Sequence, residues 1–303
     1  MADFTTGVGA HHYVSKDSGI LGPQKTLGPG EVIVETDPDL LWGEDGGWDE
    51  ERCSLAEERL KDQDKGVGVS EYWYKEYTVK ASKHWSLFYR RNGDRFFKDR
   101  HYLHVEFPEV LEANALLEVG CGVGNCVIPL LELNPKLRAH AIDFATSAID
   151  ILKEKAVERL ECAVCDVVND ELSLAGVEPG TMDLVMCMFV LSAIAPEHQQ
   201  VVVKKLADSL REGGKLLFRD YGKYDEAQLR FKKNSKLKDS FYVRQDGTCS
   251  YFFELQEVVD LFGSVGVTPV DGRCEYVRRQ MANRSTKQAR SRVWTQGVFV
   301  KTS

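Results

Sequence analysis

Residues 116–132, with the sequence LLEVGCGVGNCVIPLLE, place three glycines at alternate positions between an apolar run and an amphipathic stretch. This order is typical of a buried strand, a tight loop and the start of a helix. Glycine lets the backbone approach a ligand closely, and free N–H groups at the helix start attract its polar atoms. The loop therefore predicts a site for a dinucleotide, a phosphate or a sulfonium cofactor, unless it is purely structural.

From this loop onward, short apolar runs alternate with helical patterns. A hairpin signal, Asp246-Gly247, follows the fifth run, and two late segments, GRCEYVRRQ and SRVWTQGVFVKT, are close enough to pair antiparallel. The expected fold is α/β and doubly wound, with a seven-stranded, mostly parallel sheet and a C-terminal antiparallel hairpin. This Rossmann-like plan resembles that of class I methyltransferases. We predict strands at 115–119, 138–143, 160–165, 183–189 and 215–219, and helices near 71–91, 125–133, 146–158, 196–211 and 254–264.

The composition is that of an ordinary globular protein, with 43% hydrophobic and 28% charged residues among 303. The longest apolar run is too short to span a bilayer, and the N-terminus has no secretory or transit character. We therefore expect no membrane partner and a cytoplasmic location, with the nucleus as an open alternative. The net charge is −8, but residues 1–76 hold 17 acidic and 7 basic side chains, against 30 and 32 in the remainder. The acidity therefore does not exclude a nucleic-acid partner.

Three regions are predicted along the chain. Residues 1–70 form a loosely structured acidic region, because turn-like stretches leave few apolar anchors. Residues 71–111 form a helical lid segment, and residues 112–303 form the α/β domain.

The eight cysteines do not form a disulfide scaffold or a metal site. Cys162 and Cys165 spell CxxC, but they lie in a predicted buried strand and would point to opposite faces. No second CxxC exists to complete a zinc site. We interpret these cysteines as core residues and expect no metal.

Carboxylates near the strand ends narrow the choice of ligand. The glycines read GxGxG rather than GxGxxG, and no Gly-Lys-Ser/Thr follows, which excludes a P-loop. Asp143 ends the second strand, where it can accept from ribose hydroxyls, and Asp166 ends the third, where it can accept from an adenine amino group. Either aspartate alone would be weak evidence, since such residues also serve as caps. With Glu118 before the loop, the set favours S-adenosylmethionine (SAM) over NAD, held by Glu118, Gly120, Gly122, Gly124, Asp143 and Asp166.

Further motifs are more specific than the glycine loop. HWSLFYRRNGDRFFKDRHYLHVEFPE (84–109), FVLSAIAP (189–196), LLFRDYGKYDEAQLRFKKNSKL (216–237) and FYVRQDGTCSYFF (241–253) closely resemble the tRNA N3-methylcytidine methyltransferases. The resemblance covers roughly residues 80–300. It implies methylation of cytidine 32 in the anticodon loop and, in some members, of a cytidine in the variable arm. It also implies tRNA contact by the lid segment 71–111, a SAM-dependent methyltransferase domain at 112–303 and, in some members, help from a seryl-tRNA synthetase or another accessory protein. It also implies SAM contacts at Trp85, Tyr89, Gly120, Asp143, Asp166 and Met188.

The chemistry of such a reaction selects catalytic candidates after the fifth strand. Cytosine N3 carries an in-plane lone pair, so the enzyme must expose and align it, and must tolerate a cationic product. Asp220 is predicted to stabilise the cation, Arg219 to hold the base carbonyl or a phosphate, and Tyr221 to stack. The alternative for FRDYG is an Arg–Asp ion pair that closes a strand.

Three basic runs, 90–101, 229–238 and 277–292, predict a track for RNA phosphates if they border one cleft. Each run alone is more often a solvated face. The candidate substrate contacts are Phe97, Lys98, Arg100, Arg230, Tyr242 and Arg244, although 97–100 could also be a helix terminus, and Trp85 and Tyr89 could be packing aromatics. A small-molecule or protein methyltransferase, a catalytically idle RNA-binding subunit and, more remotely, a dehydrogenase stay open.

Overall fold

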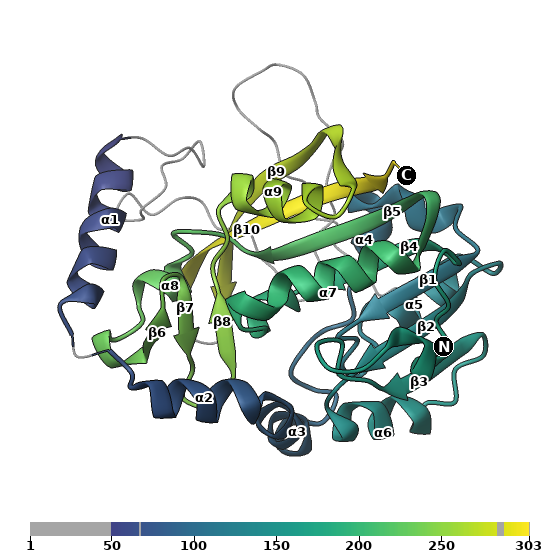
Figure 1. Cartoon of the computed structure of the whole chain (residues 1–303), viewed down its shortest axis with the longest axis horizontal. Coiled ribbons are helices and arrows are strands. Elements are labelled where there is room, and N and C mark those ends of the chain that lie inside the picture. The colour runs from purple at the N-terminus through teal and green to yellow at the C-terminus, as the bar shows by residue number, and fades with distance from the viewer. Residues whose placement is uncertain (1–49, 67, 284–287, 303) are drawn as a thin grey trace, which may run out of the picture.

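The computed structural model describes residues 50–66, 68–283 and 288–302. Its main sheet has seven strands in the order β3-β2-β1-β4-β5-β10-β9 (Figure 1). The first five strands are parallel, and β10 pairs antiparallel with both β5 and β9. This is the predicted doubly wound α/β fold with a C-terminal antiparallel hairpin. The strands are β1 (Ala115–Val119), β2 (Arg138–Asp143), β3 (Leu160–Val164), β4 (Met182–Met188), β5 (Leu210–Tyr221), β9 (Val267–Asn283) and β10 (Gln288–Lys301).

Apolar side chains alternate between the two faces of this sheet, as the pleat requires. Leu116 and Leu184 join one core cluster, whereas Leu117 and Val185 join the other. Helices α4 (Leu103–Glu106), α5 (Val127–Leu133) and α6 (Thr146–Glu154) cover the first face, and α7 (Pro196–Ser209) and α9 (Leu255–Gly263) cover the second. Figure 1 shows α7 and α9 in front of the sheet.

Cys162 and Cys165 lie on opposite faces, as predicted, but β3 ends at Val164 and is a partly exposed edge strand instead of a buried one. Cys162 packs against the core cluster under α5 and α6, and Cys165 belongs to the opposite cluster. All eight cysteines are free. Within the described ranges, no group of three or more His, Cys, Asp or Glu side chains could hold a metal ion, and no helix is long and apolar enough to cross a membrane.

A smaller sheet, in the order β6-β7-β8, lies between β5 and α9 in the chain. Its strands are β6 (Lys236–Lys238), β7 (Phe241–Val243) and β8 (Cys249–Tyr251). The turn between β7 and β8 contains Asp246 and Gly247, which confirms the predicted hairpin. Gly247 has a φ of 83°, and Asp246 Oδ1 accepts from the Thr248 N–H at 3.0 Å. The short elements α8 (Glu226–Leu229) and η4 (Lys233–Ser235) precede this sheet.

The N-terminal part differs from the sequence prediction in two ways. The single helix expected at 71–91 is two helices, α2 (Glu71–Val79) and α3 (Ala81–Asn92), which meet at Lys80 with φ −93° and ψ 14°. Within the stretch expected to be loosely structured, residues 50–64 form the helix α1 (Glu50–Asp64). Residues 1–49 lie outside the described residues, and the boundaries at 70 and 111 stay predictions.

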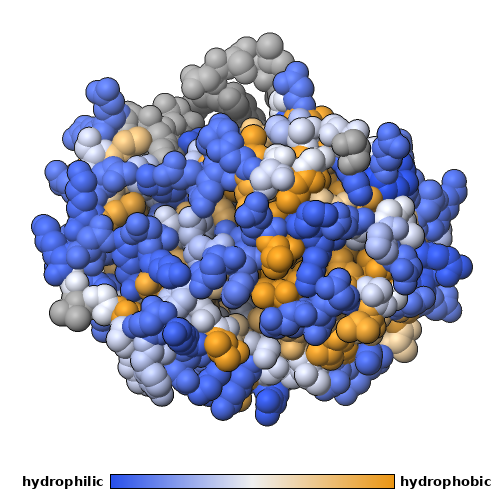
Figure 2. All heavy atoms as spheres, in the orientation of Figure 1, coloured by the Kyte–Doolittle hydropathy of each residue, from blue (hydrophilic) through white to orange (hydrophobic). Residues whose placement is uncertain are grey.

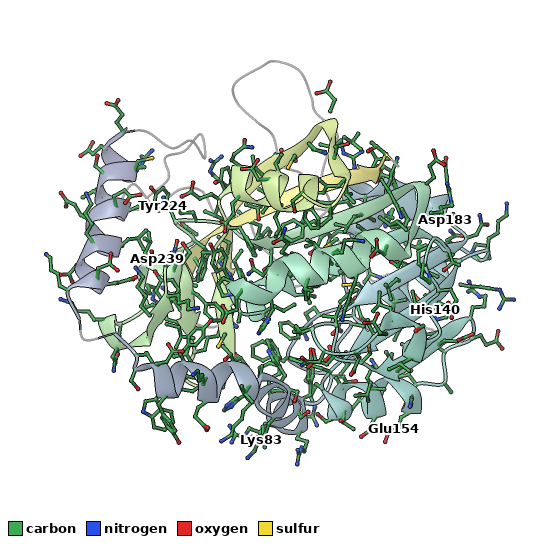
Figure 3. The ribbon with its side chains drawn as sticks, in the orientation of Figure 1. Lys83, His140, Glu154, Asp183, Tyr224 and Asp239 are labelled. Atoms are coloured by element: carbon green, nitrogen blue, oxygen red, sulfur yellow. The ribbon has the colours of Figure 1, made fainter. Side chains whose placement is uncertain are left out.

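Helix α1 is held by polar contacts and by a small apolar cluster in which Cys53, Ala56 and Leu60 pack against Tyr224 and Leu229. This apolar row is too short for hydrophobic periodicity to reveal the helix. Gln63 is buried, and its Nε2 donates to the Gln228 carbonyl at 2.9 Å. Tyr224 donates to Glu57, and it lies on the side that faces α1 in Figure 3. On the face shown in Figure 2, hydrophobic residues surface in groups separated by hydrophilic side chains.

Candidate functional site

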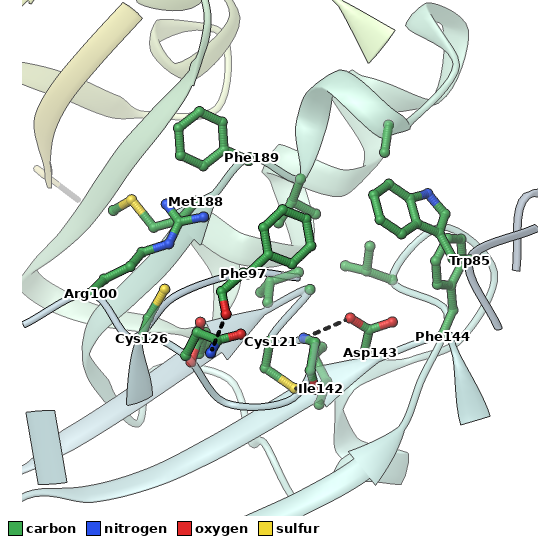
Figure 4. A pocket seen from close by; sticks show the side chains of 18 of the residues that line it. Trp85, Phe97, Arg100, Cys121, Cys126, Ile142, Asp143, Phe144, Met188 and Phe189 are labelled. Carbon is green, nitrogen blue, oxygen red and sulfur yellow. Dashed lines mark hydrogen bonds between the residues drawn. The ribbon is translucent and has the colours of Figure 1, made fainter. Parts of the chain in front are cut away.

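A cavity of about 470 Å³ lies above the carboxyl ends of the parallel strands, where ligands of doubly wound folds bind. It extends from the end of β3 across β2 and β1 to the ends of β4 and β5 and to β10. Figure 4 shows Asp143, Phe144 and Trp85 on one side of it and Arg100 and Phe189 on the other. The volume falls within the range of small-molecule sites. Twelve predicted site residues line it: Trp85, Tyr89, Phe97, Lys98, Arg100, Glu118, Gly120, Gly122, Asp143, Asp166, Met188 and Tyr221. Asn125 also lines it and was not predicted.

The glycine loop shapes the floor of the cavity. Gly120 and Gly122 line it with φ values of 60° and 53°, in the left-handed region where glycine is favoured. A Cβ on Gly122 would collide with the Tyr89 hydroxyl, and one on Gly120 would lie 2.5 Å from Val190. Gly124 does not line the cavity: its φ is 88°, and a Cβ there would meet Leu152 at 2.7 Å. The prediction that Gly124 contacts the cofactor is therefore corrected to a packing role beneath the loop.

Two buried carboxylates hold this loop in place. Asp143 Oδ2 accepts from the Gly122 N–H at 2.9 Å, the bond drawn in Figure 4, and Oδ1 accepts from Ala145 at 2.8 Å. Burial raises the pKa of Asp143 to about 6, although these two bonds act in the opposite direction. Glu118 Oε2 accepts from the Val127 N–H at 3.0 Å, and burial raises its pKa to about 7. Both groups line the cavity, so they can also meet a ligand.

Asp166 lies directly beyond β3 and is half-buried. Its Oδ1 accepts from the Val168 N–H at 3.0 Å, and its Oδ2 accepts from Asn169 Nδ2 at 2.7 Å. Asp166 therefore does cap the turn after β3, which is the alternative role that the sequence left open for it. Since the residue also lines the cavity and each carboxylate oxygen can accept more than one bond, capping does not exclude ligand binding.

Aromatic residues of α3 form one wall of the cavity. Trp85 and Tyr89 line it with ring centroids 6.1 Å apart. Helix α3 is tied to α6 where Ser147 Oγ donates to the Ser86 carbonyl at 2.8 Å. Asn125 holds the segment 97–100 against the glycine loop. Its Nδ2 donates to Asp99 at 2.9 Å, and its carbonyl accepts from the Arg100 N–H at 2.8 Å. These contacts place Phe97, Lys98 and Arg100 along the same cavity.

The other half of the cavity is aromatic and cationic, and much of it was missed by sequence reasoning. Phe189 has a φ of 61°, an unusual conformation for a bulky residue that surrounding structure must maintain. Its ring lies 5.2 Å from that of Tyr221 and 5.9 Å from that of Trp294, and the Arg100 guanidinium lies 4.7 Å above it. Arg292 completes this half. The alternation of strand β10 offered a signal, but only its pairing with β5 brings Trp294 beside Tyr221.

The structure corrects the prediction for Arg219 and Asp220. The two side chains do not form an ion pair, because successive residues of β5 point to opposite faces. Neither of them lines the cavity. Asp220 is fully buried, with Oδ2 accepting from the Ser192 N–H and Oδ1 from its neighbour Tyr221, both at 2.9 Å. Burial raises its pKa to about 6.

Arg219 points to the other face, where it is 1% exposed and forms a buried ion pair with Glu106. Its Nε donates to Gln296 Oε1 at 2.7 Å. Both residues therefore support the cavity wall instead of touching a reacting base. Of the three predicted catalytic residues, Tyr221 alone lines the cavity.

Three predicted substrate contacts lie away from the cavity. Tyr242 is a core residue, stacked on Phe231 at 4.7 Å and donating to Gln63 at 2.9 Å. Arg230 lies beside Glu226 at 3.8 Å. Arg244 stands behind Tyr221, with its guanidinium 5.3 Å from that ring, and therefore touches the site indirectly.

The three basic runs do not all border the cavity. Run 90–101 contributes several lining residues, and run 277–292 contributes Arg292. Run 229–238 contributes none. In that run, Lys233 and Lys236 form ion pairs with Asp62 and Asp64 of α1. The side chains of 280–289 lie outside the described residues.

The first half of the cavity has the features that a SAM molecule requires. Two left-handed glycines leave room where a Cβ would not fit, and carboxylates stand at successive strand ends. Residues 117–216 match the family model for a methyltransferase domain. A Burkholderia thailandensis 1,6-didemethyltoxoflavin-N1-methyltransferase, solved with its substrate and S-adenosylhomocysteine, superposes with a TM-score of 0.51 at 16% identity, over 75% of this chain and 90% of that chain. The fold is that of the class I SAM-dependent methyltransferases.

Sequence comparison narrows this class. The chain is 42% identical over 258 residues to the Homo sapiens tRNA N(3)-cytidine methyltransferase METTL6, covering 82% of this chain and 89% of the relative. It is 37% identical over 265 residues to the Saccharomyces cerevisiae tRNA(Thr) (cytosine(32)-N(3))-methyltransferase, covering 83% of this chain and 42% of that relative. The chain belongs to the tRNA N3-cytidine methyltransferase family. The roles of individual site residues stay predictions.

Proposed function

We propose that this protein transfers a methyl group from SAM to N3 of a cytidine in tRNA, at position 32 of the anticodon loop. The observation that carries the proposal is the 42% identity, over 82% of the chain, to a relative named as a tRNA N(3)-cytidine methyltransferase. Position 32 is taken from the name of the Saccharomyces cerevisiae relative. The alignment covers 258 residues and therefore extends well beyond residues 117–216, which match the general methyltransferase domain model. The two-part cavity supports it, because one half suits the cofactor and the other suits a flat, polar base.

In the first half, Trp85, Tyr89, Gly120, Gly122, Asp143 and Asp166 are proposed to bind the cofactor. SAM, when bound, supplies an electrophilic methyl group. Asp143 accepts from ribose hydroxyls and Asp166 from the adenine amino group, and the glycines leave their backbone open to the ligand. Glu118 fixes the loop through Val127. Met188, at the end of β4, borders both halves.

The second half is proposed to hold the cytosine. N3 attacks without losing a proton, so the residues must align the base rather than act as general bases. N3 lies on the Watson–Crick edge, and only an unpaired or flipped base can present it. Phe189, Tyr221 and Trp294 offer flat apolar surfaces for the base. Their ring faces also favour the positive charge that the base acquires on methylation.

Lys98 and Arg100, at the cavity, are proposed to contact the RNA backbone around the target base. Phe97 is proposed to pack against the entering nucleotide. We further propose that an accessory protein such as seryl-tRNA synthetase raises activity, and that the protein is cytoplasmic. Fluorescence microscopy of the tagged full chain tests the location, and addition of the synthetase to the assay below tests the partner.

The experiment is methyl transfer from labelled SAM to tRNA isolated from cells that lack this gene, followed by digestion and mass spectrometry. We expect 3-methylcytidine in the wild-type reaction and loss of the label when cytidine 32 is replaced by uridine. The matched enzyme control is Asp143→Asn, which should lose cofactor affinity and product together. Label in a different nucleoside, or no label with or without the synthetase while SAM binds, would overturn the proposed reaction.

A further inference from the structure

Trp294 carries a buried hydrogen-bond donor for which the described residues provide no acceptor. The side chain is 7% exposed and lines the cavity, yet its indole Nε1 has no hydrogen-bond partner there. A buried donor without an acceptor is costly, and such groups in native proteins usually await a water or a ligand. Trp294 lines the cavity, and its Nε1 atom has almost no exposed surface in the ligand-free structure, so a base that packs closely against the indole is the acceptor to consider.

The indole is held rigidly in the second half of the cavity. Trp294 stands opposite Tyr221 in the register of β10 and β5, so both side chains lie on the same face of the sheet. The Phe189 ring meets it edge-on at 79°, and the Arg219 guanidinium lies 5.4 Å from its ring. Arg219 is itself fixed by Glu106 and Gln296. The donor is therefore preorganised.

The position of the indole limits which ligand atom it can meet. Asp143 and Asp166, the proposed ribose and adenine contacts, follow β2 and β3, whereas β4 and β5 separate Trp294 from the β1 end of the sheet. An indole N–H only donates, so the partner must be an acceptor. On the Watson–Crick edge of cytosine, O2 accepts, N3 carries the reacting lone pair and the N4 amino group donates.

We infer that the Trp294 indole N–H donates to O2 of the target cytosine and thereby fixes N3 toward the methyl group. This inference rests on the proposed function and adds a base-binding residue to it. It also gives a reason to reject adenine, which presents a C–H beside N1 where cytosine presents O2. A buried donor facing a C–H would stay without an acceptor.

The test uses the full chain, SAM and an anticodon stem-loop RNA with cytidine or 2-thiocytidine at position 32. Trp294→Phe removes the N–H and keeps an aromatic ring. We expect kcat/KM for the cytidine RNA to fall roughly ten-fold or more, while the Kd for SAM stays within two-fold. For wild type, the sulfur substitution should lower kcat/KM, because sulfur is a weak acceptor. In Trp294→Phe it should lower kcat/KM no further.

Phe299→Leu is the matched control for loss of packing, since Phe299 lies on the same strand but in the core cluster away from the cavity. Equal losses in the two variants would overturn the inference, as would wild-type activity of Trp294→Phe, which would mean that water satisfies the donor. Additive effects of the variant and the sulfur substitution would exclude O2 as its partner. If wild type methylates no cytidine RNA, the proposed function fails and this inference falls with it.

Discussion

Gly122, in the glycine loop, and Gly180, in the turn before β4, both have left-handed backbone conformations but different neighbours, so substitutions should have different effects. Gly122 faces the Tyr89 hydroxyl inside the cavity, and its N–H bonds to Asp143. Gly180 has a similar φ of 69°, but no atom lies within 4 Å of the Cβ position. Alanine substitutions at Gly122 and Gly180 therefore separate the cost of the backbone conformation from the cost of a collision in the cavity.

We expect Gly122→Ala to lower the free energy of unfolding by about 2 kcal/mol or more and to weaken SAM binding at least ten-fold. The reason is that the methyl group adds a collision with Tyr89 to the backbone strain. Gly180→Ala should cost only about 1 kcal/mol and leave SAM affinity unchanged. Chemical denaturation and isothermal titration calorimetry measure both quantities. Equal SAM affinities in the two variants would contradict a ligand role for the loop.

Asp143 makes cofactor binding dependent on pH. Burial raises its pKa from an ordinary value of 3.8 to about 6. Its contribution to folding stability is therefore fully present below the unfolded pKa and is lost as the pH rises through about 6. Ribose hydroxyls bind the ionised form better, so the affinity for SAM should increase up to ten-fold per pH unit below about pH 6 and then level off.

Calorimetric titrations between pH 5 and 8 check this dependence, with Asp143→Asn as the control. The asparagine variant should bind SAM weakly and with little change across this range. A pH dependence that persists in the variant would instead implicate Glu118, whose pKa is raised to about 7 by burial.

At the scale of elements, the carboxyl end of β5 is connected to the short helix η3 (Leu191–Ala193), which follows β4. Asp220 makes this connection by accepting from the Ser192 N–H. Ala193 and Ile194, in and after η3, line the cavity. Asp220 is thus a positioning residue, and its substitution should act through the shape of the cavity.

We expect Asp220→Ala to lower the free energy of unfolding by about 2–4 kcal/mol, because two buried N–H groups lose their acceptor. Methyl transfer should fall with it. Asp220→Asn keeps one acceptor oxygen and should retain measurable turnover and most of the stability. Abolished turnover in a fully stable Asp220→Asn protein would show that the carboxylate acts directly in the reaction.

Asp183 provides a matched control for this pair of variants. Its Oδ2 also accepts two backbone N–H groups, those of Asn114 and Ala115, at 2.8 and 3.0 Å. It lies at the opposite end of the strands and does not line the cavity (Figure 3). Asp183→Ala should therefore reduce stability without a specific loss of methyl transfer.

At the scale of the whole molecule, α1 joins a segment more than 150 residues later in the chain. The contact combines two buried residues, Ala56 and Gln63, with ion pairs that reach lysines before and within the small sheet. The pairs are Glu57–Lys223 at 3.2 Å, Asp62–Lys233 at 3.0 Å and Asp64–Lys236. Such partly exposed pairs are screened by salt.

We expect the triple variant Glu57→Gln, Asp62→Asn, Asp64→Asn to loosen α1, with backbone amides of 54–64 exchanging hydrogen several-fold faster. Raising NaCl to about 0.5 M should have the same effect on wild type, because salt weakens these pairs. Hydrogen-exchange mass spectrometry measures both. The control neutralises the exposed Glu50, Glu51 and Glu58 of the same helix and should change little. Unchanged exchange in the first variant would mean that the Gln63 contacts suffice.

The parts of the fold that could be predicted depend on short-range patterns. The five parallel strands, the loop and the terminal hairpin follow from periodicity and turn residues, which neighbouring positions determine. Helix α1 could not be predicted in this way, because its apolar row is short (Cys53, Ala56 and Leu60) and its partners, such as Leu229 and Gln228, are distant in the chain. The break between α2 and α3 at Lys80 could not be predicted either, because the sequence of the two helices is helical almost without interruption.

The same division holds for the site. The sequence by itself determined that Gly120, Asp143 and Asp166 stand at neighbouring strand ends, because parallel strands bring their carboxyl ends to one edge. Only the tertiary structure decided that Asp220 turns away from the cavity, and that Trp294 enters it with an unpaired donor. The physical reason is that the face of a side chain and its partners depend on the long-range register of β5 with β4 and β10, which no local pattern specifies.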